Sequence, residues 1–233
     1  GKHYERNPDR GLYKSIDGGA TWASILFLST QTGVIDLLMD PFDPNTIYAS
    51  GWDRIRNNQE STASGNGGRI HKTTDGGTTW TQLSGGLPQY SVSRIGLSVS
   101  QKTPGTLFAC VVDSTYNLDG VYKSTNAGAN WTLLDTVGLD MNYLGGFGWY
   151  FSQIRVSPYN DDEITLIGVE SFSSYDGGSS WQKSVPDWYT YQVHADGHDM
   201  LYLDSTTVLL ATDGGLYKNP NMGNIHSWTD IDN

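Results

Sequence analysis

Short segments in which apolar and polar residues alternate run along the whole chain. Clear examples are residues 11–14, 69–72 and 121–123, and alternation with a period of two is typical of a β-strand that buries one face. Proline, aspartate and asparagine mark turns between such segments, as at 40–45 and 157–160. No stretch shows a convincing helical period. The pattern predicts an all-β protein made of short strands.

One short phrase recurs four times, at residues 15–22, 73–80, 124–131 and 174–181. It begins with Ser or Thr, continues with an acidic or amide residue and glycine, and ends in tryptophan. These shared positions are Asp17 and Trp22, Asp75 and Trp80, Asn126 and Trp131, and Asp176 and Trp181. The tryptophans are 58, 51 and 50 residues apart, and a period near 50 indicates a solenoid, an array or a propeller. A degraded fifth copy ends at Trp228.

The phrase has the composition of a tight turn. Its first hydroxyl can bond the backbone, and its carboxylate can accept the N–H groups two and three residues further on. Glycine at the next positions supplies the positive φ that a hairpin reversal needs. The tryptophan then begins the following strand and can cover the turn. We therefore assign the phrase a structural role.

Two further strand-like segments precede each phrase, which gives four strands per repeat, here called A to D, with the phrase at the C–D turn. The A strands are predicted at 34–39, 93–99, 151–156 and 193–203, and the B strands at 46–50, 106–112, 163–169 and 207–212. Four short antiparallel strands at this period predict a propeller blade. The chain is thus predicted to be a single partial β-propeller (1–233) of about four and a half blades, with pieces at 11–28, 33–84, 92–135, 151–185 and 193–231.

The phrase resembles the Asp-box (BNR) repeat of sialidases, sortilin-type receptors and xyloglucanase-type glycoside hydrolases. The likeness covers essentially the whole chain and is greatest to bacterial sortilin-like, Asp-box "glycosyl hydrolase" proteins. It departs from the pattern at Asn126 and Ala127, which stand where Asp and Gly are usual. The resemblance implies a propeller, but its members include both enzymes and receptors. Because relatives have more blades and this chain opens on Gly1, we expect a fragment whose partners include the remaining blades of a longer polypeptide.

Composition narrows the setting of this propeller. A formal net charge of −11 argues against nucleic acid and anionic lipid as partners, and no apolar run is long enough to insert in a membrane. Cys110 is the single cysteine, so we expect a buried thiol and no internal disulfide. The many Gly, Thr, Ser, Asn, Trp and Tyr residues fit a secreted or cell-surface protein. No cofactor is expected.

The topology of a propeller predicts where a ligand would bind. The B–C and D–A loops open on one face, opposite the repeated phrases, and several of these loops are long, as at 52–68 and 135–150. Extended loops on a rigid scaffold are where binding concentrates. They carry aromatic residues that can stack on sugar rings or anchor a protein; the alternative is that these rings pack the loops onto the blades. The ligand-binding candidates are Trp52, Trp149, Tyr150, Trp188, Tyr189, Tyr191 and His194.

A polar cluster stands at the start of the last predicted A strand. Alternation along that strand would place His194, Asp196 and His198 on one face. Such a row could hold a divalent metal or form a proton-transfer pair; the alternative is a structural row of hydrogen-bonded side chains. Asp213 ends the next B strand, in a segment that resembles the T-D-x-G-G-x-Y-R stretch bearing a catalytic carboxylate in xyloglucanase-type enzymes, with one residue fewer.

Two functional classes follow from these candidates. The first is a non-catalytic propeller, without a recognisable acid pair, that binds a polysaccharide or a surface protein through its loop face. The second is an extracellular hydrolase of xyloglucan or β-glucan type, in which Asp213 is paired with Asp196. Other possible partners for Asp213 are Asp53, Asp113, Asp140 and Glu170. The resemblance also includes sialidases, whose chemistry needs an arginine triad and a Tyr–Glu pair. A sialidase is disfavoured here, because no such arrangement is evident in the sequence among the arginines Arg54, Arg56, Arg69, Arg94 and Arg155.

Overall fold

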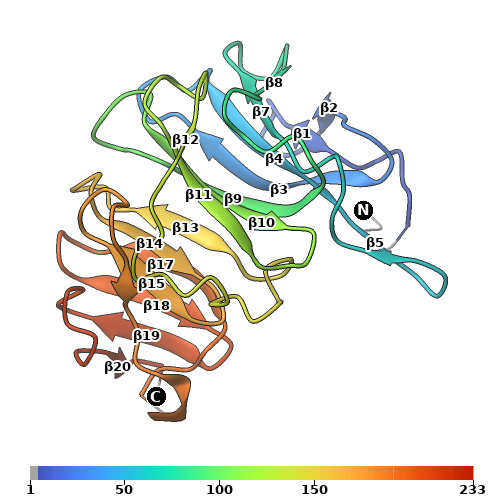
Figure 1. Cartoon of the computed structure of the whole chain (residues 1–233). Coiled ribbons are helices and arrows are strands. Elements are labelled where there is room, and N and C mark those ends of the chain that lie inside the picture. Colours follow the sequence, from blue (N-terminus) through green and yellow to red (C-terminus); the bar gives the residue numbers. More distant parts are fainter. Residues whose placement is uncertain (1–4, 191, 233) are drawn as a thin grey trace.

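The chain folds into a row of antiparallel sheets that follow one another in sequence order (Figure 1). The computed structural model describes residues 5–190 and 192–232. The first sheet has two strands, β1 (Leu12–Lys14) and β2 (Ala23–Leu26). Four sheets of four strands each follow it. Together they form four and a half blades of a β-propeller, which confirms the fold predicted from the alternation and the repeats.

Each complete blade is a simple meander from its first to its fourth strand. The first of these blades contains β3 (Thr32–Met39), β4 (Ile47–Asp53), β7 (Ile70–Thr73) and β8 (Thr81–Gln82), and the second contains β9 (Val92–Val99), β10 (Leu107–Asp113), β11 (Leu118–Ser124) and β12 (Thr132–Leu133). The third contains β13 (Gln153–Val156), β14 (Ile164–Ile167), β15 (Ser171–Ser174) and β16 (Gln182–Lys183), and the fourth contains β17 (Gly197–Tyr202), β18 (Val208–Thr212), β19 (Gly215–Asn219) and β20 (Thr229–Asp230).

Two small elements lie in the loops between these strands. The hairpin of β5 (Ile55–Arg56) and β6 (Ser61–Thr62) projects between β4 and β7, and the 3-10 turn η1 (Trp188–Thr190) lies between β16 and β17. The first strands of neighbouring blades contact one another in the order β3, β9, β13, β17. They are therefore the inner strands, and their N-terminal ends all open toward one face.

The last inner strand differs from its prediction in a way that matters for function. A strand was expected from residue 193, but β17 begins only at Gly197. Asp196 has a φ of 65°, which interrupts an extended backbone. The N–H groups of Asp196 and Gly197 bond the carbonyls of Val169 and Gly168 in the preceding blade, at 3.1 and 2.8 Å. The expected alternation of His194, Asp196 and His198 along one strand is therefore wrong.

The four repeated turns (15–22, 73–80, 124–131 and 174–181) share two hydrogen bonds from main-chain N–H groups to side chains. In the first turn, Ser15 Oγ accepts the N–H of Gly19 at 2.7 Å and Asp17 Oδ1 accepts that of Thr21 at 2.9 Å. Both bonds span four residues, whereas the carboxylate was expected to reach two and three residues; Asp176 also accepts the N–H of Ser179, three residues on, at 3.0 Å. The indole of Trp22 donates to the Gly19 carbonyl at 3.1 Å, and the second and third turns have the same bond, whereas Trp181 donates to the Asp135 carbonyl outside its turn. The two shared bonds close each turn on itself, which is the geometric basis of the structural role predicted for the phrase.

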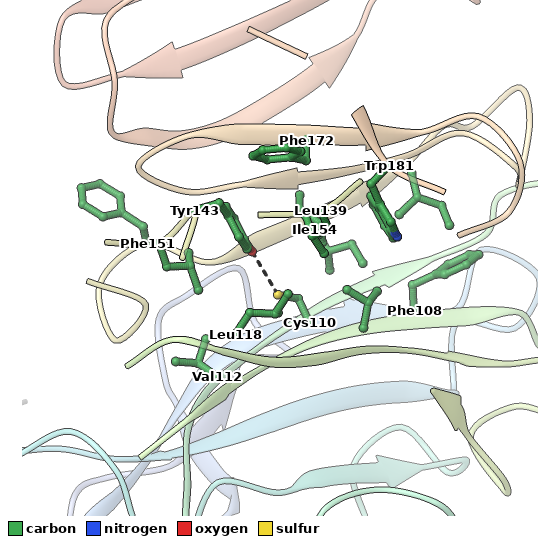
Figure 2. Packing of buried hydrophobic residues seen from close by; sticks show 14 of the residues in the cluster. Phe108, Cys110, Val112, Leu118, Leu139, Tyr143, Phe151, Ile154, Phe172 and Trp181 are labelled. Carbon is green, nitrogen blue, oxygen red and sulfur yellow. Dashed lines mark hydrogen bonds between the residues drawn. The ribbon is translucent and has the colours of Figure 1, made fainter. Parts of the chain in front are cut away.

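Buried apolar side chains fill the spaces between successive blades. Figure 2 shows the largest cluster, in which residues of β10 face residues of β13 and β15 together with Trp181. Cys110 is fully buried there, with its Sγ 3.4 Å from Tyr143 Oη and 3.3 Å from Ser152 Oγ. Burial raises the pKa of this thiol, so the predicted inert cysteine has a packing role.

The two ends of the blades are different surfaces. The repeated turns dock on the loops between first and second strands: the N–H groups of Gly76, Ala127 and Gly177 bond the carbonyls of Asn45, Gly105 and Asp162, at 3.0, 2.8 and 3.0 Å. The opposite end carries the β5–β6 hairpin and the long loops before β13 and β17. The loop face is thus separate from the repeated turns, as the topology requires.

Candidate functional site

A cleft of about 760 Å³ opens on the loop face. It is lined by the segment before β1, the first residues of β3, β9 and β17, the end of β4 with the hairpin that follows, and the loop before β13. These segments come from all parts of the sequence and meet because the inner strands converge. The size lies within the range of ordinary ligand pockets, roughly 300–1,000 Å³.

Three of the predicted ligand-binding aromatics lie together in this cleft. Trp52, Trp149 and Tyr150 all line it, and the ring centroids of Trp149 and Tyr150 are 5.5 Å apart. The Arg54 guanidinium carbon lies 4.8 Å from the Trp149 ring and 5.7 Å from the Trp52 ring. This cation–π arrangement joins the end of β4 to the loop before β13, about a hundred residues further on in sequence, and places one guanidinium against both indoles.

The other predicted aromatics lie elsewhere. Trp188 and Tyr189 are on η1 and are 59% and 60% exposed, but they do not line the cleft. Tyr189 Oη donates to Asp187 at 2.6 Å, and Asp187 is also bonded by Lys183. His194 is exposed and its Nδ1 lies 2.7 Å from the Ala195 carbonyl, while the predicted Tyr191 lies outside the described residues.

The two predicted catalytic carboxylates are close together beside the cleft. Asp213 directly follows β18 and its side chain is 52% exposed. Its main-chain N–H bonds the Asp196 carbonyl at 3.1 Å, and its Oδ1 lies 2.5 Å from Nε2 of His198, which lines the cleft. Burial and then the charge of Asp213 raise the pKa of Asp196, whereas His194 and His198 oppose that shift.

The other carboxylates considered as partners for Asp213 are held by structural contacts. Asp53 accepts the Thr32 hydroxyl at 2.5 Å and the Gly67 N–H at 3.0 Å, and Asp113 accepts N–H groups of its own loop. Asp140 accepts the Asn142 N–H, and Glu170 pairs with Lys183 at 2.7 Å. These contacts leave Asp196 as the partner that the structure brings beside Asp213.

The metal site considered from the sequence would require His194, Asp196 and His198 to face a common point. Within residues 5–190 and 192–232, no group of three or more His, Cys, Asp and Glu side chains is placed to hold a metal ion. His198 faces Asp213, and Nδ1 of His194 faces a main-chain carbonyl. The three residues His194, Asp196 and His198 therefore do not converge on a common point.

The four arginines that line the cleft were not among the site residues predicted from the sequence. They are Arg10, Arg54, Arg56 and Arg94. They come from three separate segments, so no motif joins them in sequence. One signal was available: Arg94 is a charged residue near the start of an inner strand whose neighbours are mostly buried, and inner strands face the centre of a propeller.

Comparisons with known proteins agree with this architecture. No family model matches the chain. It is similar to a xyloglucanase of Hypocrea jecorina (strain QM6a), with 25% identity over 78% of this chain and 23% of that protein, and to a xyloglucanase of Paenibacillus sp, with 20% identity over 76% and 20%. The chain thus spans about a fifth of the length of the curated relatives that it matches.

A solved structure extends the likeness to the fold. An ancestral GH74 enzyme aligns with 98% of this chain and 29% of its own, with a TM-score of 0.64 and 16% identity. At that identity the match speaks for the fold alone. Taken with the xyloglucanase matches, it supports a propeller related to glycoside hydrolases. No helix among the described residues is long and apolar enough to cross a membrane.

Proposed function

We propose that this protein is a secreted or cell-surface Asp-box propeller that binds a polysaccharide in the cleft of its loop face. The observation that carries the proposal is the convergence of Trp52, Trp149 and Tyr150 on that cleft. Aromatic rings on a rigid support pack against the apolar faces of sugar rings with little loss of side-chain entropy. The similarity to xyloglucanases favours a polysaccharide over a surface protein as the partner.

Two tryptophans provide a matched test of this proposal. Trp149 lines the cleft, whereas Trp188 is exposed on η1 away from it. Removing an anchor from a binding site costs more than about 1 kcal/mol, so Trp149→Ala should weaken binding of the best polysaccharide in a neutral and acidic panel by roughly fivefold or more. Trp188→Ala should leave the affinity unchanged. Affinity electrophoresis measures both, and equal effects of the two changes would refute the cleft as the site.

A second candidate function is hydrolysis of the bound polysaccharide. It is favoured by the placement of Asp196 and Asp213 beside the cleft, where Asp213 contributes to the raised pKa of Asp196. Glycosidases use two carboxyl groups whose environments differ, so that one donates a proton while the other acts as base or nucleophile. In this scheme Asp196 would be the acid and Asp213, held by His198, the second carboxylate.

The hydrolase candidate is tested by substitution of each carboxylate. A positioned acid or base contributes roughly 10²–10⁴-fold to a rate, so Asp196→Asn and Asp213→Asn should each abolish release of reducing ends from xyloglucan or β-glucan. Asp187→Asn is the control, since Asp187 is bonded to Lys183 and Tyr189 away from the cleft. If the parent chain binds these glucans without releasing reducing ends, binding stands and hydrolysis is rejected.

A further inference from the structure

The cleft is positively charged although the protein as a whole is acidic. Four arginines line it, together with a single acidic residue, Asp9, whereas the chain has 14 Lys and Arg against 25 Asp and Glu. The concentration of guanidinium groups at one point of an acidic surface is a local feature that the net charge conceals. A cleft lined by one sign of charge attracts ligands of the opposite sign.

Two of these arginines are available to a ligand. Arg56 is exposed on the β5–β6 hairpin, and Arg94 bonds the Tyr150 carbonyl through Nη1. Among the described residues, neither is in an ion pair with a carboxylate. Arg94 Nε is buried and makes no hydrogen bond with the part of the chain that the structure describes. A buried guanidinium N–H without an acceptor is costly, so the positive charge of Arg94 is incompletely compensated by the protein. An anion in the cleft would stabilise that charge through the part of the group that lines the cleft.

The other two arginines add charge and order to the same site. Arg10 donates to the carbonyls of Gln31 and Arg54, at 2.9 and 2.6 Å. The Arg54 side chain donates to the Thr62 carbonyl at 3.1 Å and lies against the indole rings of Trp52 and Trp149. These carbonyl contacts hold the side chains in place, so the positive charge at the cleft wall is pre-positioned.

Two carboxylates whose charges act on these arginines, Asp53 on Arg10 and Asp36 on Arg94, are held by hydrogen bonds within the blades. Asp36 Oδ1 accepts the Leu37 N–H and Oδ2 accepts the Leu97 N–H, each at 2.9 Å. Asp53 is buried and bonded by Thr32 and Gly67. Neither carboxylate lines the cleft. Both carboxylates already accept hydrogen bonds from fixed donors. They therefore do not neutralise the arginines in place of an acidic ligand.

We propose that the cleft binds an acidic polysaccharide, with the carboxylate of a uronic acid residue received by Arg56 and Arg94 and the sugar ring packed on the adjacent aromatics. Guanidinium groups pair with carboxylates through two parallel hydrogen bonds. Arg94 is bonded to the main-chain carbonyl of Tyr150, Arg54 lies against the Trp149 ring, and the rings of Trp149 and Tyr150 are 5.5 Å apart. The inference deepens the proposed polysaccharide binding and rests on it. A uronate satisfies both halves of the site, since it carries an anion on a ring with an apolar face.

The test compares one glycan with and without its charge. Oligogalacturonate and its methyl ester have the same sugar rings, and only the former carries carboxylates. Isothermal titration calorimetry with the whole chain should show that the acid binds at least about tenfold more tightly than the ester. The ratio of the two affinities should fall as salt is added. Arg56→Gln and Arg94→Gln should each weaken binding of the acid by about fivefold to tenfold and leave the ester nearly unaffected.

Controls distinguish a failure of charge recognition from a failure of polysaccharide binding itself. Lys102→Gln removes one positive charge from a loop at the opposite end of the blades and should change nothing. Arg56 is exposed, so its variant should keep the parent's thermal unfolding midpoint even if that of Arg94 does not. Equal affinity for acid and ester, unmoved by the arginine changes, overturns the inference while polysaccharide binding stands. Preference for a sulfated glycan or for an oligonucleotide also overturns it, and no binding of any glycan removes both proposals.

Discussion

The first and third repeated turns have nearly the same local structure and very different surroundings. In both, the first serine accepts an N–H four residues on, and the tryptophan donates to a glycine carbonyl at 3.1 Å. Trp22 is nevertheless 62% exposed, whereas Trp131 is 5% exposed. The turn therefore forms from its own residues, but burial of its tryptophan depends on something else.

The difference lies in the blade before the turn. Leu83 and Leu87 pack against the cluster that contains Trp131, and the main-chain N–H of Trp131 bonds the Gly85 carbonyl at 2.8 Å. All three of these partners follow β8, the outer strand of the preceding blade. Trp181 and Trp228 are covered in the same way, with their indoles donating to the carbonyls of Asp135 and Ser184. In the described part of the chain no blade precedes the turn that carries Trp22. The tryptophan of a repeated turn thus packs its own blade against the preceding one.

The largest expected effect compares these two tryptophans directly. Trp131→Ala should lower the free energy of unfolding by about 3–5 kcal/mol, because it empties a site in a packed core between two blades. Trp22→Ala should lower it by less than about 1 kcal/mol, because the exposed ring loses little contact. Urea unfolding followed by circular dichroism measures both. Similar losses in the two variants would mean that the tryptophan acts within its own turn.

A second prediction concerns acid stability and again contrasts the third turn with the others. Hydrogen bonds from Thr21, Thr79 and Ser180 lower the pKa of Asp17, Asp75 and Asp176 to about 2 in each case, whereas an unfolded chain has an aspartate pKa of about 3.9. The folded state therefore favours the carboxylate, and the stability it adds is complete above about pH 4 and is lost as the pH falls toward 2. Asn126 in the third turn does not titrate.

Substitutions at these positions test that contrast. Replacing all three aspartates by asparagine should flatten the fall in stability between about pH 4 and pH 2, and Asn126→Asp should make it steeper. The measurement is the urea midpoint of each variant at several pH values, relative to the parent chain. Since Asp204 also has a pKa lowered to about 2 and is unchanged in these variants, some acid sensitivity should persist. An unchanged pH profile in the triple variant would show that the turn carboxylates do not contribute.

The sequence predicted those features that are determined by neighbouring residues. Alternation and the repeated turns gave the blades, because each depends on contacts within about fifty residues. It failed at Asp196, where the backbone is held by the hydrogen bonds that Asp196 and Gly197 donate to the carbonyls of Val169 and Gly168 in another blade. It also failed to assemble Arg10 and Arg94, since their proximity depends on how successive blades are arranged around the centre. Trp52 and Trp149 were named as candidates from loop position alone, but only the structure shows the arginine between them.

The smallest expected effect isolates the backbone of the third turn. Ala127 has a φ of 56°, where the other turns have glycine, and an L-residue with a Cβ is strained in that region. Ala127→Gly should therefore raise the free energy of unfolding by up to about 1 kcal/mol, the relief of strain being partly offset by the greater freedom of glycine in the unfolded chain. Ala129→Gly, two residues on and without a positive φ, should instead lower it. A loss of stability in both variants would show that the third turn has relaxed around its alanine and differs from the other turns in more than sequence.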